Sequence, residues 1–273
     1  MTLRILSLRI LSLGWGVQSW TLAAMAAVGE IEPFDFAIHS DTTFERQETY
    51  QFAEQWTPWL QERGLPIVTV SDPRATHIMK KSSTSEGTYT LMPVFTLAQD
   101  GSKGQLRRQC TSRWKIEPLH KWLSGELARR DITKSNGAIV QALGISMDEW
   151  QRMKSSPVDW IENTYPLVDM RMSRDDCLRW LGAHGLPSPG KSACVQCPYH
   201  SPRVWRDMKR ANDEDWQAAV AADEQLRATG NQWYLHPARI PLIDAARTPE
   251  DDGQMSLWDE EVDPTCDSGH CFL

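Results

Sequence analysis

The sequence predicts an α/β protein with a doubly wound parallel sheet and a helical, cysteine-bearing C-terminal part. Two observations lead to this fold class. Residues 9–27 contain a short alternating run, a pair of glycines and then a helix-forming stretch, which is the order strand, loop, helix. The same rhythm of strand and helix continues to Val70, and strands separated by helices pair in parallel through right-handed crossovers.

The first half of the chain is expected to supply three strands and two helices. The strands are expected at residues 10–13, 34–39 and 66–70, and the helices at 20–27 and 45–63. Pro58 lies inside the second helix, and a proline at such a position is expected to kink the helix or split it in two. The carboxyl ends of these strands form the edge at which such sheets bind ligands.

The second half of the chain is less regular. Between residues 71 and 104 the pattern is weak, and so long an irregular span predicts a lid on the substrate side. A fourth buried strand is expected at 138–145, and helices are expected at 116–129, 147–154, 174–184, 203–211 and 213–227. These elements divide the chain into an α/β domain at 9–155, a helical part at 156–246 and an acidic mobile tail at 247–273.

The composition excludes several classes of function. The formal net charge of −7 disfavours a surface that binds nucleic acid through phosphate contacts. No apolar run approaches the roughly 20 residues that span a bilayer, and Arg4 and Arg9 interrupt the apolar start, so we expect a cytoplasmic protein with no membrane partner. In that compartment the six cysteines are expected to be thiols, metal ligands or redox groups rather than disulfides.

The glycine loop after the first strand is the leading candidate for an anion site. Loop glycines let backbone N–H groups approach a phosphate, and the helix that follows supplies unpaired donors. The loop sequence GWGVQS at 14–19 resembles the pyrophosphate-binding loop, or PP-loop, whose usual form is Ser-Gly-Gly-x-Asp-Ser. Gln18 stands where that family usually has an Asp that faces Mg²⁺. The alternative interpretation is a strand, turn and helix whose glycines serve packing alone.

The PP-loop resemblance implies that the domain at 9–155 is a nucleotide-binding domain. The loop residues that it assigns to the nucleotide are Ser12, Gly14, Gly16, Gln18 and Ser19.

Cys194-x-x-Cys197 is the strongest local signal for a metal or redox site, because a two-residue spacing lets both thiolates face one metal. Cys110 follows a basic pair, and Cys177 lies in the first turns of a predicted helix. Four thiolates hold either a [4Fe–4S] cluster or a tetrahedral zinc ion. The alternative is two buried free thiols and a CxxC dithiol.

Several segments together resemble the phosphoadenosine/adenosine phosphosulfate (PAPS/APS) reductase family. The segment CTSRWKIEPL at 110–119 resembles the Cys-x-x-x-x-Lys-x-x-Pro-Leu segment of that family. Residues 41–50 resemble its Asp-Thr-Gly…Glu-Thr-Tyr segment, and residues 144–152 resemble the segment after its fourth strand. The run from 165 to 198 resembles a reductase-like branch found often in phages and mobile elements. The resemblance spans residues 9 to 210, in the family's order.

The resemblance implies an adenine nucleotide as ligand, either ATP or PAPS/APS, with Mg²⁺ as a further candidate. Asp41 and Thr42 follow the second strand, where Asp41 is expected to hold ribose or Mg²⁺ or else to cap a turn. Lys115 and Arg152 are expected to contact phosphate or sulfate groups, or else to be solvated helix charges.

In cluster-bearing members of the family, a cysteine beside the Lys-x-x-Pro-Leu helix and a later CxxC pair ligate [4Fe–4S]. This pattern assigns Cys110, Cys194 and Cys197, and we add Cys177 because this sequence lacks the second cysteine beside Cys110. The reductases also use a C-terminal nucleophilic cysteine, and Cys271 is similar in position. The residues predicted to be catalytic are therefore Lys115 and Cys271.

Two functions of different classes follow. The first is an enzyme that reduces an activated sulfate or transfers sulfur, using the cluster and a protein reductant as partner. The second is a nucleotide-binding accessory protein of a defence system, for example a CRISPR-associated one, or of a mobile element, with catalysis lost. The retained cysteines favour the first function, and Gln18 favours the second.

Overall fold

A five-stranded parallel sheet forms the centre of the molecule. The computed structural model describes residues 7–73, 78–81, 88–190, 192–211 and 213–245. The strands lie in the order β3-β2-β1-β8-β9, and every neighbouring pair is parallel. Their bounds are β1 Leu8–Ser12, β2 Phe36–Asp41, β3 Ile67–Ser71, β8 Ile139–Ala142 and β9 Ile161–Thr164. The α/β fold with a parallel sheet, predicted from the sequence, is confirmed.

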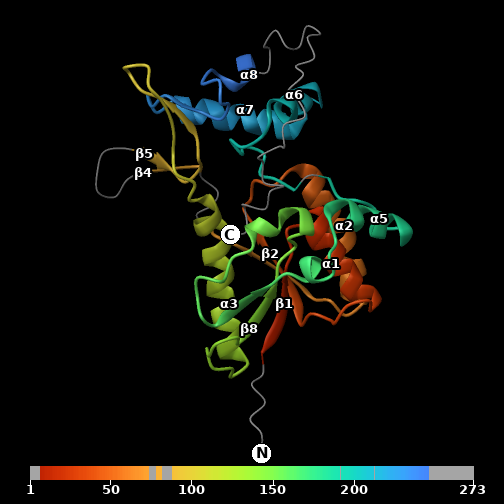
Figure 1. Cartoon of the computed structure of the whole chain (residues 1–273). Helices are drawn as coiled ribbons and strands as arrows, with labels where there is room; N and C mark the ends of the chain where they lie inside the picture. Colours follow the sequence, from red (N-terminus) through yellow and green to blue (C-terminus); the bar gives the residue numbers. More distant parts are fainter. Residues whose placement is uncertain (1–6, 74–77, 82–87, 191, 212, 246–273) are drawn as a thin grey trace, which may run out of the picture.

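Helices cover both faces of this sheet, which makes it doubly wound (Figure 1). The longer helices divide between the two faces. They are α1 Val17–Val28, α2 Gln47–Glu62 and α5 Arg174–Ala183 on the first face, and α3 Glu117–Arg129 on the second. Alternate residues of a strand point to opposite faces, so Leu11 belongs to the core under α1, whereas Ile10 meets Leu123 in the core under α3.

A second core lies beyond the carboxyl edge of the sheet, at the top of Figure 1. It buries Trp114, Trp205 and Trp216 between an early segment and a late segment of the chain. The early strands are β4 Met79–Lys81, β5 Thr88–Thr90, β6 Phe95–Leu97 and β7 Lys103–Gln105. The late elements are α6 Pro202–Ala211, α7 Glu214–Arg227, β10 Trp233–Tyr234 and α8 Leu242–Ala245.

These early strands contradict the irregular lid expected between residues 71 and 104. Strands β4 and β5 form a hairpin, and β6 lies between β7 and β10 in an antiparallel sheet. Each early strand has three residues, which is too short for a clear alternation of apolar and polar side chains. Their pairing with each other and with β10 therefore gives no local pattern in the sequence.

Helix α2 is not split at Pro58. Trp56 and Trp59, on either side of the proline, pack their rings 5.3 and 5.9 Å from the ring of Trp20 in α1. Aromatic packing of this kind contributes on the order of 1 kcal/mol per pair beyond the buried area. The contact with α1 therefore offsets part of the cost of the missing N–H group.

Three further elements differ from the expected ones. A π-helical turn, η1 Thr111–Ile116, precedes α3, and a 3₁₀ segment, η2 Met147–Arg152, replaces the helix expected at 147–154. A short helix, α4 Pro166–Asp169, follows β9. Because β9 pairs with β8, the expected boundary at residue 155 cuts through the sheet, and the part at 156–246 is not only helical.

The acidic tail expected at 247–273 lies outside the described residues. Among the helices that the structure describes, none is long and apolar enough to cross a membrane.

Candidate functional site

The order of strands in the sheet reverses between β1 and β8. The chain adds β2 and β3 outward from β1 and then returns to place β8 on the other side of β1. Ligands of open α/β sheets bind in the crevice at the carboxyl edge where such a reversal occurs. Here the loop after β1, at 13–16, and the loop after β8, at 143–146, flank this crevice.

The loop after β1 is held in shape by two serines. The Ser19 hydroxyl donates to the Gly16 carbonyl at 3.2 Å and accepts from the Gly14 N–H at 3.2 Å. Ser192 donates to the Gly14 carbonyl at 2.5 Å, which ties the cysteine-bearing segment to this loop. Gly16 is the N-cap of α1 and has no side chain to bond the first amides, so these N–H groups can bind an anion.

Trp15, between the two loop glycines, has a backbone φ of +59°. This left-handed conformation is unusual for a bulky residue, and such outliers cluster at ligand-binding sites. The buried Trp15 ring stacks on Trp20 at 6.3 Å and meets the edge of Phe52 at 6.3 Å. The packing of this ring therefore holds the loop in its strained shape before any ligand arrives.

Gly144 brings the loop after β8 against the loop after β1. A Cβ atom at position 144 would lie 2.7 Å from the backbone nitrogen of Ser19 and 3.0 Å from its Cα. A Cβ on Gly16 would meet only the Cβ of Ser192, at 3.7 Å, which is an ordinary contact. The close approach between loops thus requires glycine at 144, a position that the sequence analysis did not assign to the site.

Gln18 and Arg152, both predicted site residues, meet through Glu149. The Gln18 amide donates to Glu149 Oε2 at 3.3 Å and to the Ser146 hydroxyl at 3.4 Å. Arg152 pairs with Glu149 at 2.6 Å, and the Arg152 side chain is 8% exposed. Glu149 departs from helical φ/ψ inside η2, so the spacing of Ser146, Glu149 and Arg152 does not by itself place them on one face. Ser146 and Glu149 reach Gln18 through the arrangement of the strands, and the sequence analysis missed both residues.

A cavity of about 230 Å³ opens at the carboxyl ends of four strands of the sheet. The strands contribute Ser12, Ser40, Gln141 and Asn163, and the segment entering α3 contributes Lys115, Ile116, Leu119 and His120. Ser12 and Gln141 are buried, so their polar atoms face the cavity or the protein rather than bulk water. Of the strand residues in this cavity, the sequence predicted Ser12 alone.

Asp41 and Thr42, at the end of β2, are engaged by neighbouring residues. Asp41 Oδ1 accepts from the Tyr50 hydroxyl at 2.8 Å and from the Thr43 N–H at 2.7 Å. Thr42 donates to Glu45 Oε1 at 3.1 Å and contacts the Cys194 sulfur at 3.3 Å. For Asp41 these bonds favour the turn-capping role that the sequence left open.

Lys115 forms a buried ion pair with Glu45. The Lys115 Nζ and Glu45 Oε1 atoms are 3.2 Å apart, and the side chains are 10% and 1% exposed. Burial alone would lower the pKa of Lys115 and raise that of Glu45, but their attraction outweighs burial and shifts both pKa values the opposite way. Both groups are therefore charged, and the ammonium that was expected to meet the substrate has a protein carboxylate as partner.

Three of the four predicted metal ligands line one small cavity. Cys110, Cys194 and Cys197 surround a space of about 30 Å³ beside Lys115. Burial raises the pKa of all three thiols, that of Cys197 to about 11. These groups are therefore protonated at neutral pH.

Cys177, predicted as the fourth ligand, lies elsewhere, and this prediction is wrong. Its side chain is fully buried in the core under α1, together with Trp20 and Leu181. The reason is the register of α5: residues four apart share a helix face, so Cys177 joins Leu181 on the face that packs against α1.

The thiol cavity does not offer the donor set of a metal centre. Within the described part of the chain, no three His, Cys, Asp or Glu side chains are grouped so that they could hold one ion. About 30 Å³ is room for about one water molecule, which is too little for a cluster of four irons and four sulfides. The geometry therefore supports neither the [4Fe–4S] cluster nor the zinc alternative on these residues. Cys271, the predicted nucleophile, lies outside the described residues.

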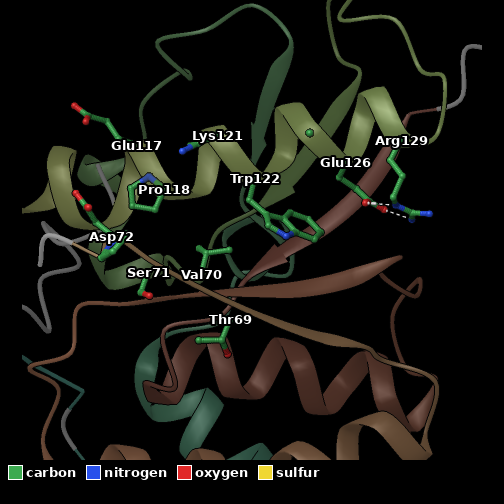
Figure 2. A pocket seen from close by; sticks show the side chains of 12 residues that line it. Thr69, Val70, Ser71, Asp72, Glu117, Pro118, Lys121, Trp122, Glu126 and Arg129 are labelled. Atoms are coloured by element: carbon green, nitrogen blue, oxygen red, sulfur yellow. Dashed lines mark hydrogen bonds and ion pairs between the residues drawn. The ribbon is translucent and has the colours of Figure 1, made fainter.

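A larger cavity, of about 780 Å³, lies between β3 and α3 (Figure 2). Figure 2 shows Trp122 projecting from α3, with the ion pair of Glu126 and Arg129 at one end of the cavity. This cavity flanks the edge strand, whereas the order of strands reverses at β1. We assign the candidate site to the smaller cavity, because polar groups from four strands converge there.

Comparison with known proteins finds a likeness to solved structures. No protein-family model matches the chain, and no curated protein matches it. Among solved structures, the chain is similar to phosphoadenylyl-sulfate (PAPS) reductase from Candida auris in its phosphate complex, with a TM-score of 0.41 and 13% identity over 68% of this chain and 80% of that chain. A likeness of this size carries no argument about the site, which rests on the geometry above.

Proposed function

We propose that the carboxyl edge of the sheet binds an adenine nucleotide. Its phosphates would lie on the loop at 14–19, and its nucleoside would enter the cavity of about 230 Å³. One observation carries the proposal: the loop, the N-terminus of α1 and the buried Arg152 converge where the strand order reverses. The choice of adenine comes from the resemblance of the loop and the later segments to PP-loop reductases.

The size of the cavity suits part of a nucleotide. Sites that enclose a whole ligand measure roughly 300–1,000 Å³, so a cavity of about 230 Å³ fits a base and ribose with the phosphates outside it. Leu119 and Leu143 supply apolar surface for the base. The Ser12 hydroxyl and the Gln141 amide supply donors and acceptors for its polar edge or for the ribose.

Nucleotide binding is common to both functions predicted from the sequence, the reductase and the accessory protein. A reductase would need an accessible thiolate, and Cys271, the cysteine predicted for that role, lies outside the described residues. Gln18 bonds to Glu149 through its amide, which agrees with a site that holds a nucleotide without cleaving it.

The test compares two glycines by calorimetric titration with ATP and with PAPS. Gly144→Ala is expected to weaken binding by about ten-fold or more, because its Cβ would displace the backbone of Ser19. Gly182→Ala in α5, whose added Cβ would meet no atom within 4 Å, is the matched control outside the loop and is expected to bind like the wild type. Thermal denaturation checks that both variants fold. If the wild type binds neither nucleotide, the proposal fails.

A further inference from the structure

We infer that the nucleotide is bound as a metal-free anion, and that the guanidinium of Arg152 takes the place that Mg²⁺ has at many phosphate sites. The inference rests on the proposed function and names the form in which the ligand enters the site. It follows from the way in which the carboxylates around the loop at 14–19 are already paired.

Glu149 is the carboxylate that contacts this loop, and it is neutralised within the protein. Its Oε2 atom accepts from the Gln18 amide at 3.3 Å and lies 2.6 Å from the guanidinium of Arg152. Mg²⁺ at nucleotide sites is usually held by one or two carboxylates together with the phosphates. A magnesium ion would have to displace a guanidinium that is 8% exposed in order to reach this oxygen.

The carboxylates at the end of β2 are engaged as well. Asp41 Oδ1 accepts from Tyr50 and from the Thr43 N–H, and Glu45 is paired with Lys115. Position 18, which faces the crevice, carries a neutral amide. The donor set around the loop therefore does not fit Mg²⁺, whereas it fits an anion.

The donors near the loop favour the free nucleotide. The ion pair with Glu149 offsets the net charge of Arg152, so the guanidinium would act on a phosphate through charge-assisted hydrogen bonds rather than as an unpaired charge. The N-terminus of α1 adds a partial positive charge. Free ATP carries more negative charge than its magnesium complex and is expected to gain more from both.

Two substitutions should move the metal dependence in opposite directions. Gln18→Asp would place a second carboxylate beside Glu149, and a pair of carboxylates is what Mg²⁺ prefers. Binding of ATP is then expected to fall about ten-fold or more in EDTA, by charge repulsion, and to recover in Mg²⁺. Glu149→Gln keeps the size of the side chain and releases Arg152 from its partner, so metal-free ATP is expected to bind about ten-fold more tightly.

The matched control is Glu117→Gln. Glu117 is paired with Arg113 at 2.8 Å on the exposed surface of α3, away from the loop. Removing its charge is expected to leave the affinity and its metal dependence unchanged.

The experiment is calorimetric titration of the full chain with ATP, in EDTA and in excess MgCl₂. We expect the wild type to bind equally well or more tightly in EDTA, and Gln18→Asp to reverse that order. A wild type that binds only in Mg²⁺ would overturn the inference and leave the proposed function standing. Absence of binding in both conditions would overturn both. A Glu149→Gln variant that binds metal-free ATP no better than Glu117→Gln would remove Arg152 from the role given to it.

Discussion

The ammonium of Lys115 and the carboxylate of Glu45 face each other where water is largely excluded. The Cys194 thiol and the Thr42 hydroxyl lie against the same carboxylate oxygen, so this pair fastens the cysteine segment to the end of β2. The second oxygen of Glu45 is buried and has no hydrogen-bond partner among the described residues. Lys115 therefore offsets most of the cost of burying the negative charge of Glu45.

Lys115→Met should consequently destabilise the protein by about 3–5 kcal/mol, because it leaves a buried charge without its partner. Urea denaturation at pH 7 measures this change in the free energy of unfolding. The double variant Glu45→Gln/Lys115→Met should be more stable than Lys115→Met alone. Arg113→Met breaks an exposed pair and is expected to cost less than about 1 kcal/mol. Equal losses in Lys115→Met and Arg113→Met would contradict the role of the buried pair.

Local motifs predicted those site residues whose position depends on one loop or one helix. The loop at 14–19 follows from its glycines, and three of the four cysteines are brought to one cavity. Glu149 and Gly144 act through contacts with Gln18 and Ser19, more than a hundred residues away in the chain. Such contacts depend on the order of the strands, and no spacing within the sequence records them.

Helix α3 covers one face of the sheet and also lines part of both cavities, the small one and the large one. Gly125 interrupts its interior, although a Cβ there would have no atom within 4 Å. Neither crowding nor a left-handed backbone requires glycine at this position. Because Gly125 has no side chain, none projects from this position into the large cavity.

Gly125→Ala should therefore stabilise the protein by about 1 kcal/mol, the difference in helix propensity between the two residues. Gly182→Ala in α5, which also has open space around the added Cβ, is expected to give a similar gain. Thermal denaturation of the two variants provides the measurement. A loss of stability in Gly125→Ala alone would mean that the wall of the cavity is not open in solution.

At the level of elements, the sequence predicted long periodic segments well and short ones poorly. Helices α2, α3, α5 and α7 lie close to their expected ranges, because each repeats an apolar face over several turns. The strands β4 to β7, with three residues each, and the two-residue β10 contain too few positions to show a period.

At the scale of the whole molecule, one polar contact connects the second core to the core under α1. Asp215, in α7 of the second core, accepts from the Gln47 N–H at 3.0 Å and pairs with Arg46 at 3.4 Å. Arg46 is the N-cap residue of α2, and its own side chain provides no cap. A residue from the second core thus caps a helix of the first, although 168 positions separate Asp215 from Gln47.

Asp215→Ala is expected to cost about 2 kcal/mol, because it removes a helix cap and leaves Arg46 without this carboxylate partner. For a chain of this size the melting temperature should fall by roughly 5 °C. Asp207→Ala, at an exposed position paired with Arg210, should change the melting temperature by less than about 2 °C. Equal shifts for the two variants would show that the cap does not join the cores.

The interleaved order of the second core has a consequence for synthesis on the ribosome. Strand β6 is made long before β10, its partner in the small sheet, and at about 5–20 residues per second the interval is on the order of ten seconds. During that time Leu91, Val94 and Trp114, all buried in the finished protein, have no C-terminal helices to cover them. The nascent chain therefore presents an apolar segment of the kind that chaperones hold, while the sheet at 8–71 already has its first three strands.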